Sequence, residues 1–481
     1  MMKKLNKKQL KNLIEPFLYH YLDQDYYEVL EIEPKNLITY NRLDLIYKIV
    51  YLRSINYKNN YFTKYYLDHI KSFNFGKFIE FENHSKNSES KFINVFKNID
   101  RNIDEEGFDD SLSIIPLSAD GSILNGSHRV ASSIFRNRKV KCIKLSCKPF
   151  FYDYEFFTNH LVNQAWLEDI VLNYISESEK FSVALIWPRA DLENKKLKKF
   201  FKKIIYFKEI KLSFRALDQL IKSVYKNEEW LGSKDKENNG SIYKTIQCYK
   251  RNKSLRLIIF ENKFNKDILR IKSKIRTICN IDNHSIHTLD TKEEAINITR
   301  ILLNKNSINH LNNYVFSKDK YNYLKSLEKS INKTNLSNED FILSHNSSLY
   351  LYGFKKNYSK DIFEIYSNKY TEKDKTNIIN FKTKFNDEII YNPENYFWFN
   401  NIKFISISGI LFLYNNRVID LDKSTLFKLR RKNIYSIFYI SQKSRILCSF
   451  LIGVLKYKGV KIRNFLKNYF GNIKRKFYHL R

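Results

Sequence analysis

Short apolar runs alternate along this chain with stretches whose apolar residues recur at helical spacing. Two of the runs, residues 182–187 and 255–260, are typical of buried strands, and helical segments lie between them. Since strands alternating with helices pack as sheets covered by helices, we predict an α/β (α+β) fold. With 481 residues, the chain is long enough for several domains, each with its own core.

The apolar pattern divides the chain into four parts. They are residues 1–150 with a helical N-terminus over about 5–73, a middle α/β domain at 151–334, a second α/β domain at 335–425, and a helical tail at 426–481. Further strands are predicted at 140–145, near Phe341, at 362–366 and at 402–407, with a connecting segment at 386–395.

Composition excludes several classes of protein. Hydrophobic residues at 43% and aromatic residues at 16% are too many for a disordered chain, and 11 Gly and 6 Pro exclude a collagen-like repeat. The five cysteines form no CxxC pair, so we expect no zinc module and a reducing, cytoplasmic location. No signal peptide is recognisable, and the longest apolar runs, 404–414 and 446–455, fall short of the ~20 residues of a membrane span.

The chain is strongly basic. It has 84 Lys and Arg against 51 Asp and Glu, a formal net charge of +33. Such a charge suits a nucleic-acid partner. It also follows from an AT-rich genome, which encodes Lys, Asn, Ile, Tyr and Phe together, so the charge alone does not identify a partner.

A strand–turn–helix unit ends in Asn125, Gly126, Ser127, His128 and Arg129. Gly126 can take a positive φ or let a phosphate approach the backbone. Ser127 is the predicted N-cap of the following helix, whose first amides and dipole attract an anion. His128 and Arg129 would add donors, and arginine can grip a phosphate with two parallel hydrogen bonds. The alternative is a structural turn in which His128 and Arg129 have no special role.

Asp120-Gly121 followed by this turn resembles the signature of the ParB/sulfiredoxin superfamily, in which a strand leads into a Gly-x-His-Arg turn and a helix. The resemblance is strongest over residues 112–145 and extends loosely over 40–150. It implies a nucleotide- or phosphate-binding domain in which residues 125–129 contact the phosphates. Members bind or hydrolyse nucleotides, transfer phosphate, or partition DNA. Ser127 stands where sulfiredoxin-type chemistry needs a cysteine, so that chemistry is not expected.

A phosphotransferase also needs a general base and usually Mg²⁺, and both require carboxylates. Asp109, Asp110 and Asp120 are the candidates nearest in sequence. We expect ATP or another nucleoside triphosphate with Mg²⁺ as cofactor. The sequence does not identify the metal ligands or select among the three aspartates.

A second polar cluster contains His284, His287, Asp290 and Glu294. Histidines and carboxylates together can bind a metal. On a strand, however, His284 and His287 would point to opposite faces. Capping of the next helix by Asp290 or Thr291 and local hydrogen bonds are therefore favoured over a metal site, and a contact to phosphate or nucleotide stays open.

Residues 344–365 resemble the nucleotidyltransferase pattern of Gly-Ser, a later Gly and an Asp-x-Asp strand. The resemblance places Ser347 at the serine, Gly353 at the later glycine and Asp361 at the first carboxylate. Asn346 replaces the first glycine, and Phe363 replaces the second aspartate. Because two-metal transfer needs both carboxylates, we predict a degenerate nucleotidyltransferase-like domain without catalysis at 335–425.

The basic charge is concentrated at the end of the sequence. Residues 423–481 contain 16 Lys and Arg and no Asp or Glu, and apolar residues line one side of the expected helix. A basic amphipathic helix suits an anionic membrane surface, and we expect residues 443–481 to bind one at the inner face of the cytoplasmic membrane. Nucleic acid is a less suitable partner because its surface does not require apolar side chains, and a packed terminal helix is the structural alternative.

Three functions follow from these patterns. The first is a nucleotide-dependent phosphotransferase (kinase-like) of the ParB/sulfiredoxin type, acting on a small-molecule or glycan acceptor in cell-surface polysaccharide synthesis or modification. The second is a ParB-like DNA-binding protein or nuclease, and the third is a non-catalytic nucleotide sensor or scaffold.

Overall fold

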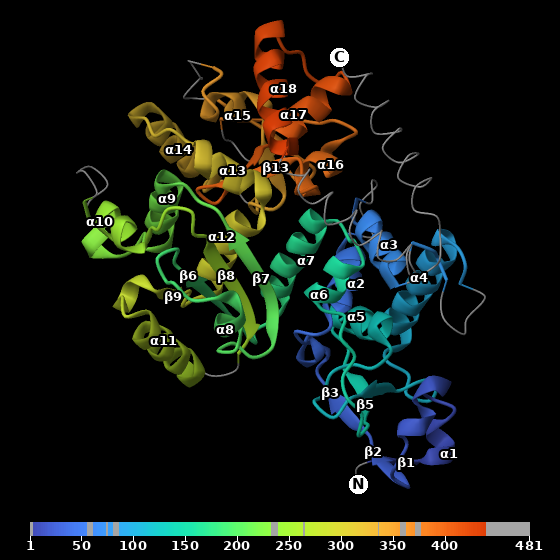
Figure 1. Cartoon of the computed structure of the whole chain (residues 1–481). Coiled ribbons are helices and arrows are strands. Elements are labelled where there is room, and N and C mark those ends of the chain that lie inside the picture. The colour runs from blue at the N-terminus through green and yellow to red at the C-terminus, as the bar shows by residue number, and fades with distance from the viewer. Residues whose placement is uncertain are drawn as a thin grey trace, which may run out of the picture. The chain divides into compact units, whose positions relative to one another are not determined.

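The structure is a computed structural model that describes residues 3–54, 61–73, 76–79, 86–231, 239–262, 265–334, 336–355, 362–370 and 377–438. Helices are combined with antiparallel and mixed sheets, which confirms the α/β (α+β) class (Figure 1). Contacts between Cα atoms divide the chain into two units, residues 1–406 and 407–481. Within the first unit, one sheet of three or more strands lies in each of the ranges 1–150, 151–334 and 335–405.

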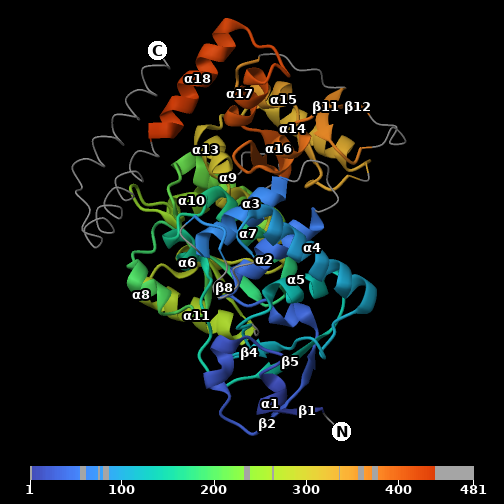
Figure 2. The ribbon, with the colours of Figure 1, turned by 90° about the vertical axis from the view of Figure 1, so that its right-hand side faces the viewer.

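The first of these sheets has the strand order β3-β5-β4, with bounds Leu30–Ile32, Val140–Lys144 and Ile115–Leu117. β4 and β5 are parallel, and β3 is antiparallel to β5. The parallel pair is joined through α5 (Ser127–Phe135), which packs against α2 (Leu43–Arg53) and α4 (Glu89–Glu106). Figures 1 and 2 both show these three helices side by side. The strand predicted at 140–145 is confirmed.

The helical N-terminus predicted over residues 5–73 is only partly correct. Two antiparallel strands pair Leu5 with Tyr27, and their core includes Leu10 and Leu18. The sequences of these two strands, Lys-Leu-Asn and Tyr-Tyr-Glu, lack a continuous aliphatic run, which is why the sequence did not reveal them. The elements before the sheet helices are β1 (Lys4–Asn6), α1 (Lys7–Leu10), η1 (Pro16–Tyr21), β2 (Tyr26–Glu28) and η2 (Pro34–Leu37), and α3 (Tyr61–Phe73) follows α2.

The middle sheet is wholly antiparallel, in the order β7-β8-β6-β9. One face, with Ala184 and Ile258, packs on α8 (Asn194–Lys198) and α11 (Asn265–Cys279), while Val183 on the other face is also fully buried. The strands predicted at 182–187 and 255–260 are confirmed.

The strands of this sheet are β6 (Phe181–Ile186), β7 (Ile204–Ile210), β8 (Leu255–Glu261) and β9 (Ile286–Thr288). The remaining helices of the middle region are α6 (Tyr154–Asn159), α7 (Gln164–Glu177), α9 (Phe214–Val224), η3 (Glu229–Leu231), α10 (Asn239–Cys248), η4 (Asp282–His284) and α12 (Lys292–Leu303).

The third sheet is mixed, in the order β12-β11-β10-β14-β13. The predicted connection at 386–395 instead contains a helix, whose Ile389 and Ile390 are fully buried. The strands are β10 (Phe341–Leu343), β11 (Phe363–Ser367), β12 (Ile378–Phe381), β13 (Tyr396–Phe399) and β14 (Ile402–Ile405), and the helices are α13 (Lys305–Asn313), α14 (Lys318–Ile331), α15 (His345–Leu351) and α16 (Asn386–Tyr391).

The second unit contains α17 (Ile407–Asn415) and α18 (Lys423–Phe438), which pack on one another. No helix within the described residues is long and apolar enough to cross a membrane. Residues 443–481, for which we predict membrane-surface binding, lie outside the described residues.

Candidate functional site

The turn before α5 has the geometry of an uncapped helix N-terminus. Gly126 is the N-cap residue, with a left-handed φ of 87°, and no side chain caps the first turn. The predicted cap, Ser127, is instead the first residue of the helix, because Gly126 takes the cap position in a left-handed conformation. Asn125 accepts a hydrogen bond from the amide of Gly126 at 2.6 Å. The amides of the first turn are therefore left for a ligand or for water.

Arg129 lies at this helix end. Its Nη2 atom is 2.9 Å from the position that a Cβ atom would take on Gly126. Burial lowers the pKa of Arg129, and Glu15 is the carboxylate that acts on it electrostatically. Within the described part of the chain, the guanidinium makes no hydrogen bond and no ion pair. A guanidinium that makes no direct hydrogen bond or ion pair, beside a positive helix end, favours an anion at this place.

His128 faces α3. Its Nε2 atom lies 2.9 Å from the hydroxyl of Tyr66, and the ring of Phe96 meets the imidazole edge-on with centroids 4.6 Å apart. Burial and the charge of Lys48 hold the pKa of His128 well below its ordinary value. The imidazole is therefore neutral at pH 7, and the positive charge at this turn comes from Arg129.

A buried charged cluster, which the sequence analysis missed, lies on α2 and α3. Arg42 holds both carboxylate oxygens of Asp44, at 2.7 and 2.9 Å, and Lys48 donates to the same carboxylate at 3.1 Å. Lys48 also lies 3.3 Å from Nε2 of His69. Arg42 and Lys48 hold the pKa of Asp44 well below its usual range, while burial lowers that of His69. Two cations against one carboxylate leave a net positive charge near α5.

The three candidate catalytic aspartates occupy separate places. Asp109 accepts hydrogen bonds from the amide and hydroxyl of Ser111, and Asp110 pairs with Lys3 at 2.9 Å. Asp120 accepts from the Ser118 hydroxyl at 2.7 Å within its own turn. These contacts are structural, and none of them reaches α5, so the role of a general base stays a prediction for all three.

No group of three or more His, Cys, Asp and Glu side chains among the described residues is arranged to hold a metal ion. The four cysteines that the structure describes are free thiols. Comparison with protein-family models, with curated proteins and with solved structures finds no match for this chain. The ParB/sulfiredoxin and nucleotidyltransferase resemblances therefore rest on their motifs alone.

The cluster from His284 to Glu294 is arranged differently from the expected strand. His284 lies in η4, a 3₁₀ turn, and His287 in β9. This turn interrupts the alternation, so both histidines line one cavity instead of opposite faces. Thr291 caps α12, and Glu294 accepts from the amide of Asp290 at 2.9 Å, which confirms the capping interpretation.

The nucleotidyltransferase-like motif gives less support to a catalytic function than the turn before α5 gives to phosphate binding. Ser347 is fully buried within α15, and Asp361 lies outside the described residues. The carboxylate found at the start of α15 is Glu364 of β11, which accepts from Ser344 and Asn346, both at 2.8 Å.

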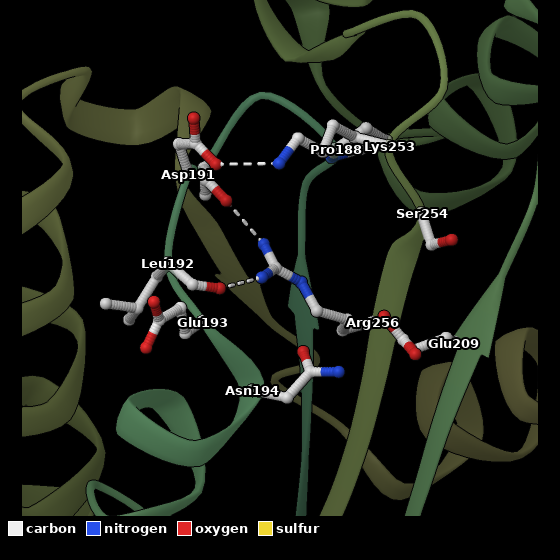
Figure 3. Close-up of a pocket in the computed structure, with 10 residues that line it drawn as sticks. Pro188, Asp191, Leu192, Glu193, Asn194, Glu209, Lys253, Ser254 and Arg256 are labelled. Atoms are coloured by element: carbon white, nitrogen blue, oxygen red, sulfur yellow. Dashed lines mark hydrogen bonds and ion pairs between the residues drawn. The ribbon is translucent and has the colours of Figure 1, made fainter.

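A small cavity of about 270 Å³ lies beside the loop that leads into α8 (Figure 3). Asp191 pairs there with Lys250 and Lys253 at 2.9 and 3.0 Å, and the two lysines lower the pKa of Asp191 to about 2. Arg256 donates to the backbone carbonyls of Ala190 and Leu192 (Figure 3). These interactions hold the loop against β8, so we assign this cavity no function.

Proposed function

We propose that this chain binds the phosphates of a nucleoside triphosphate at the N-terminus of α5. The observation that carries the proposal is the guanidinium of Arg129, which lies beside an uncapped helix end and makes no hydrogen bond or ion pair among the described residues. Backbone amides, the helix dipole and a planar guanidinium are together suited to a phosphate. The net positive charge of Arg42, Asp44 and Lys48 increases this preference.

The reaction we propose is phosphoryl transfer to a small-molecule or glycan acceptor, as the ParB/sulfiredoxin-like motif implies. The carboxylates described near α5 do not form a ligand set for Mg²⁺, so the described residues alone do not fit a resident metal site. Mg²⁺ would enter with the triphosphate, whose oxygens are its usual ligands. Attachment of residues 443–481 to the inner face of the cytoplasmic membrane, and a role in cell-surface polysaccharide synthesis, belong to the same proposal.

A non-catalytic nucleotide sensor is the second candidate. The observation that favours it is that Asp109, Asp110 and Asp120 are each engaged in contacts that do not reach α5. A sensor needs only binding, whereas a phosphotransferase also needs a base that activates the acceptor.

Titration of the full-length protein with ATP, CTP and GTP in the presence of Mg²⁺, followed by calorimetry, tests the proposal. We expect Arg129→Ala to weaken binding by about 10-fold or more, as the loss of a charged hydrogen-bond donor implies. Arg101→Ala is the matched control, because Arg101 is exposed on α4. Equal affinities of wild type and Arg129→Ala would remove the proposed site.

Product analysis separates the two candidates. Nucleotide consumed with a phosphorylated acceptor supports the phosphotransferase, and tight binding without product supports the sensor. If duplex DNA is retained with a steep salt dependence while no nucleotide binds, the ParB-like DNA-binding alternative replaces both.

A further inference from the structure

A second cavity, in the middle domain, is distinct from the α5 turn. Its volume is about 700 Å³, within the range of sites that hold small organic ligands. The residues that matter for its chemistry are Tyr225, Trp230, Tyr243, Lys244, Arg276 and His287. They come from the end of α9, η3, α10, α11 and β9, so residues far apart in the sequence meet here.

Two cations line this cavity without carboxylate partners. Lys244 is only 8% exposed, and its Nζ donates to the carbonyl of Asn283 at 2.9 Å. The Nε atom of Arg276 is buried and has no hydrogen-bond partner. Neither side chain forms an ion pair with any described residue, and no Asp or Glu lines the cavity. Since two unpaired cations near one another repel, a bound anion would stabilise this arrangement.

Burial disfavours the charged forms of the basic groups at this cavity. It lowers the pKa of Lys244, and the charge of Arg276 lowers it further, while the carboxylate of Asp282 acts in the opposite direction. His284, at the same cavity, also has its pKa lowered by burial and by Lys244. A bound anion would favour the charged form of Lys244, which burial alone disfavours.

Aromatic rings form the other side of the cavity. Tyr225 and Trp230 meet edge-on with ring centroids 5.1 Å apart, and the centroids of Tyr225 and His287 are 4.8 Å apart. Trp230 is 44% exposed and Tyr243 is 63% exposed, which leaves large ring surfaces open beside the cavity. Exposed aromatic faces of this kind are suited to stacking with a planar ligand.

We infer that this cavity binds a phosphate monoester carried on a planar ring system, the chemistry of a nucleoside monophosphate. The ring lies among Tyr225, Trp230 and Tyr243, and the phosphate lies at Lys244 and Arg276. Two cations match the double negative charge of a phosphate monoester, whereas a carboxylate requires only one. This site does not depend on the proposed phosphate site at Arg129.

Calorimetric titration of the full-length protein with AMP, CMP, GMP and UMP tests the inference. At least one of them is expected to bind, and its parent nucleoside is expected to bind at least 10-fold more weakly, as the loss of charged hydrogen bonds implies. Quenching of tryptophan fluorescence on binding, lost in Trp230→Phe, locates the ring. If none of the four nucleotides binds, or if nucleoside and nucleotide bind equally, the inference fails.

Variants separate this site from the one at α5. Lys244→Gln and Arg276→Gln are each expected to weaken binding by about 10-fold or more, because each removes one cation from the phosphate. Lys274→Gln is the control, since Lys274 is exposed on the same helix as Arg276. Circular dichroism confirms that the variants are folded. The inference is overturned if Arg129→Ala abolishes nucleoside monophosphate binding while Lys244→Gln leaves it unchanged, or if benzoate binds more tightly than every nucleotide.

Discussion

Arg129 and Gly126 occupy adjoining space at the start of α5: Nη2 of the arginine is 2.9 Å from where a Cβ atom of residue 126 would be. On the other side, the same Cβ would lie 2.6 Å from Cδ1 of Ile115 in β4. A side chain at residue 126 would therefore require both the end of the Arg129 side chain and the terminal methyl group of Ile115 to move. The absence of a side chain at this residue is what allows the guanidinium to lie over the helix end.

Gly126→Ala is expected to destabilise the protein by about 2–3 kcal/mol. The left-handed φ alone costs roughly 1–2 kcal/mol for a residue with a Cβ atom, and the close contacts add to this. Gly353→Ala is the matched control, because Gly353 is a left-handed residue (φ 78°) after α15 with nothing within 4 Å of its Cβ position. Urea unfolding of both variants gives the comparison, and equal losses would contradict the steric argument.

The strands that the sequence revealed are those with long apolar runs. β6 and β8 begin and end within one residue of their predictions because four or more apolar residues stand between polar ones. β7 was missed because Lys208 and Glu209 interrupt its pattern, although Lys208 is only 17% exposed and pairs with Glu168 at 2.8 Å. Strand order was not predictable, because the pairing of β6 with β9 joins residues about 100 positions apart.

The candidate site was predicted in part for a similar reason. The strand, turn and helix around Gly126 are local, so residue types at fixed spacing are enough to indicate them. Asp44 and Lys48 were missed because periodicity assigns charged residues to the solvent side of a helix, whereas α2 is buried from Leu43 to Leu52. Only the tertiary structure places Arg42 and His69 beside them.

Asp44→Asn is expected to destabilise the protein by about 3–5 kcal/mol at pH 7, because it leaves Arg42 and Lys48 buried without a counter-charge. Since these cations lower the pKa of the Asp44 carboxyl in the folded state, its contribution is present above the unfolded pKa of about 4 and is lost as the pH falls. Urea unfolding at pH 7 measures the loss.

The control for Asp44→Asn is an exposed ion pair. Glu193 lies 4.0 Å from Lys196, and both side chains are more than two-thirds exposed. Glu193→Gln is expected to change the free energy of unfolding by less than about 0.5 kcal/mol. If the two variants lose the same stability, the buried cluster does not have the role that its burial implies.

Residues 443–481 are predicted to bind anionic membranes. Each Lys or Arg near such a surface contributes about 1 kcal/mol, and the apolar side of the expected helix adds to this. The full chain is therefore expected to sediment with phosphatidylglycerol vesicles, and a chain ending at residue 438 is not. Phosphatidylcholine vesicles are the control. If both chains sediment equally with the vesicles, membrane binding lies outside residues 443–481. If neither chain sediments, no part of the protein binds the membrane.

The carboxyl of Asp169 in α7 is expected to make the free energy of unfolding depend on pH. Burial raises the pKa of this carboxyl to about 7, although Tyr65 donates to it at 3.2 Å. The unfolded value is about 4, so between these pH values the folded state holds a proton that the unfolded state lacks. The free energy of unfolding therefore falls as the pH rises from about 4 to 7.

Asp169→Asn removes this fall. The free energy of unfolding of the variant, relative to that of the wild type, is therefore expected to be about 2–4 kcal/mol higher at pH 8 than at pH 5. Urea unfolding at both pH values measures the difference, with Asp290→Asn as an exposed control expected to change it by less than about 0.5 kcal/mol. A wild type and an Asp169→Asn variant with parallel pH profiles would show that Asp169 is ionised in the folded protein.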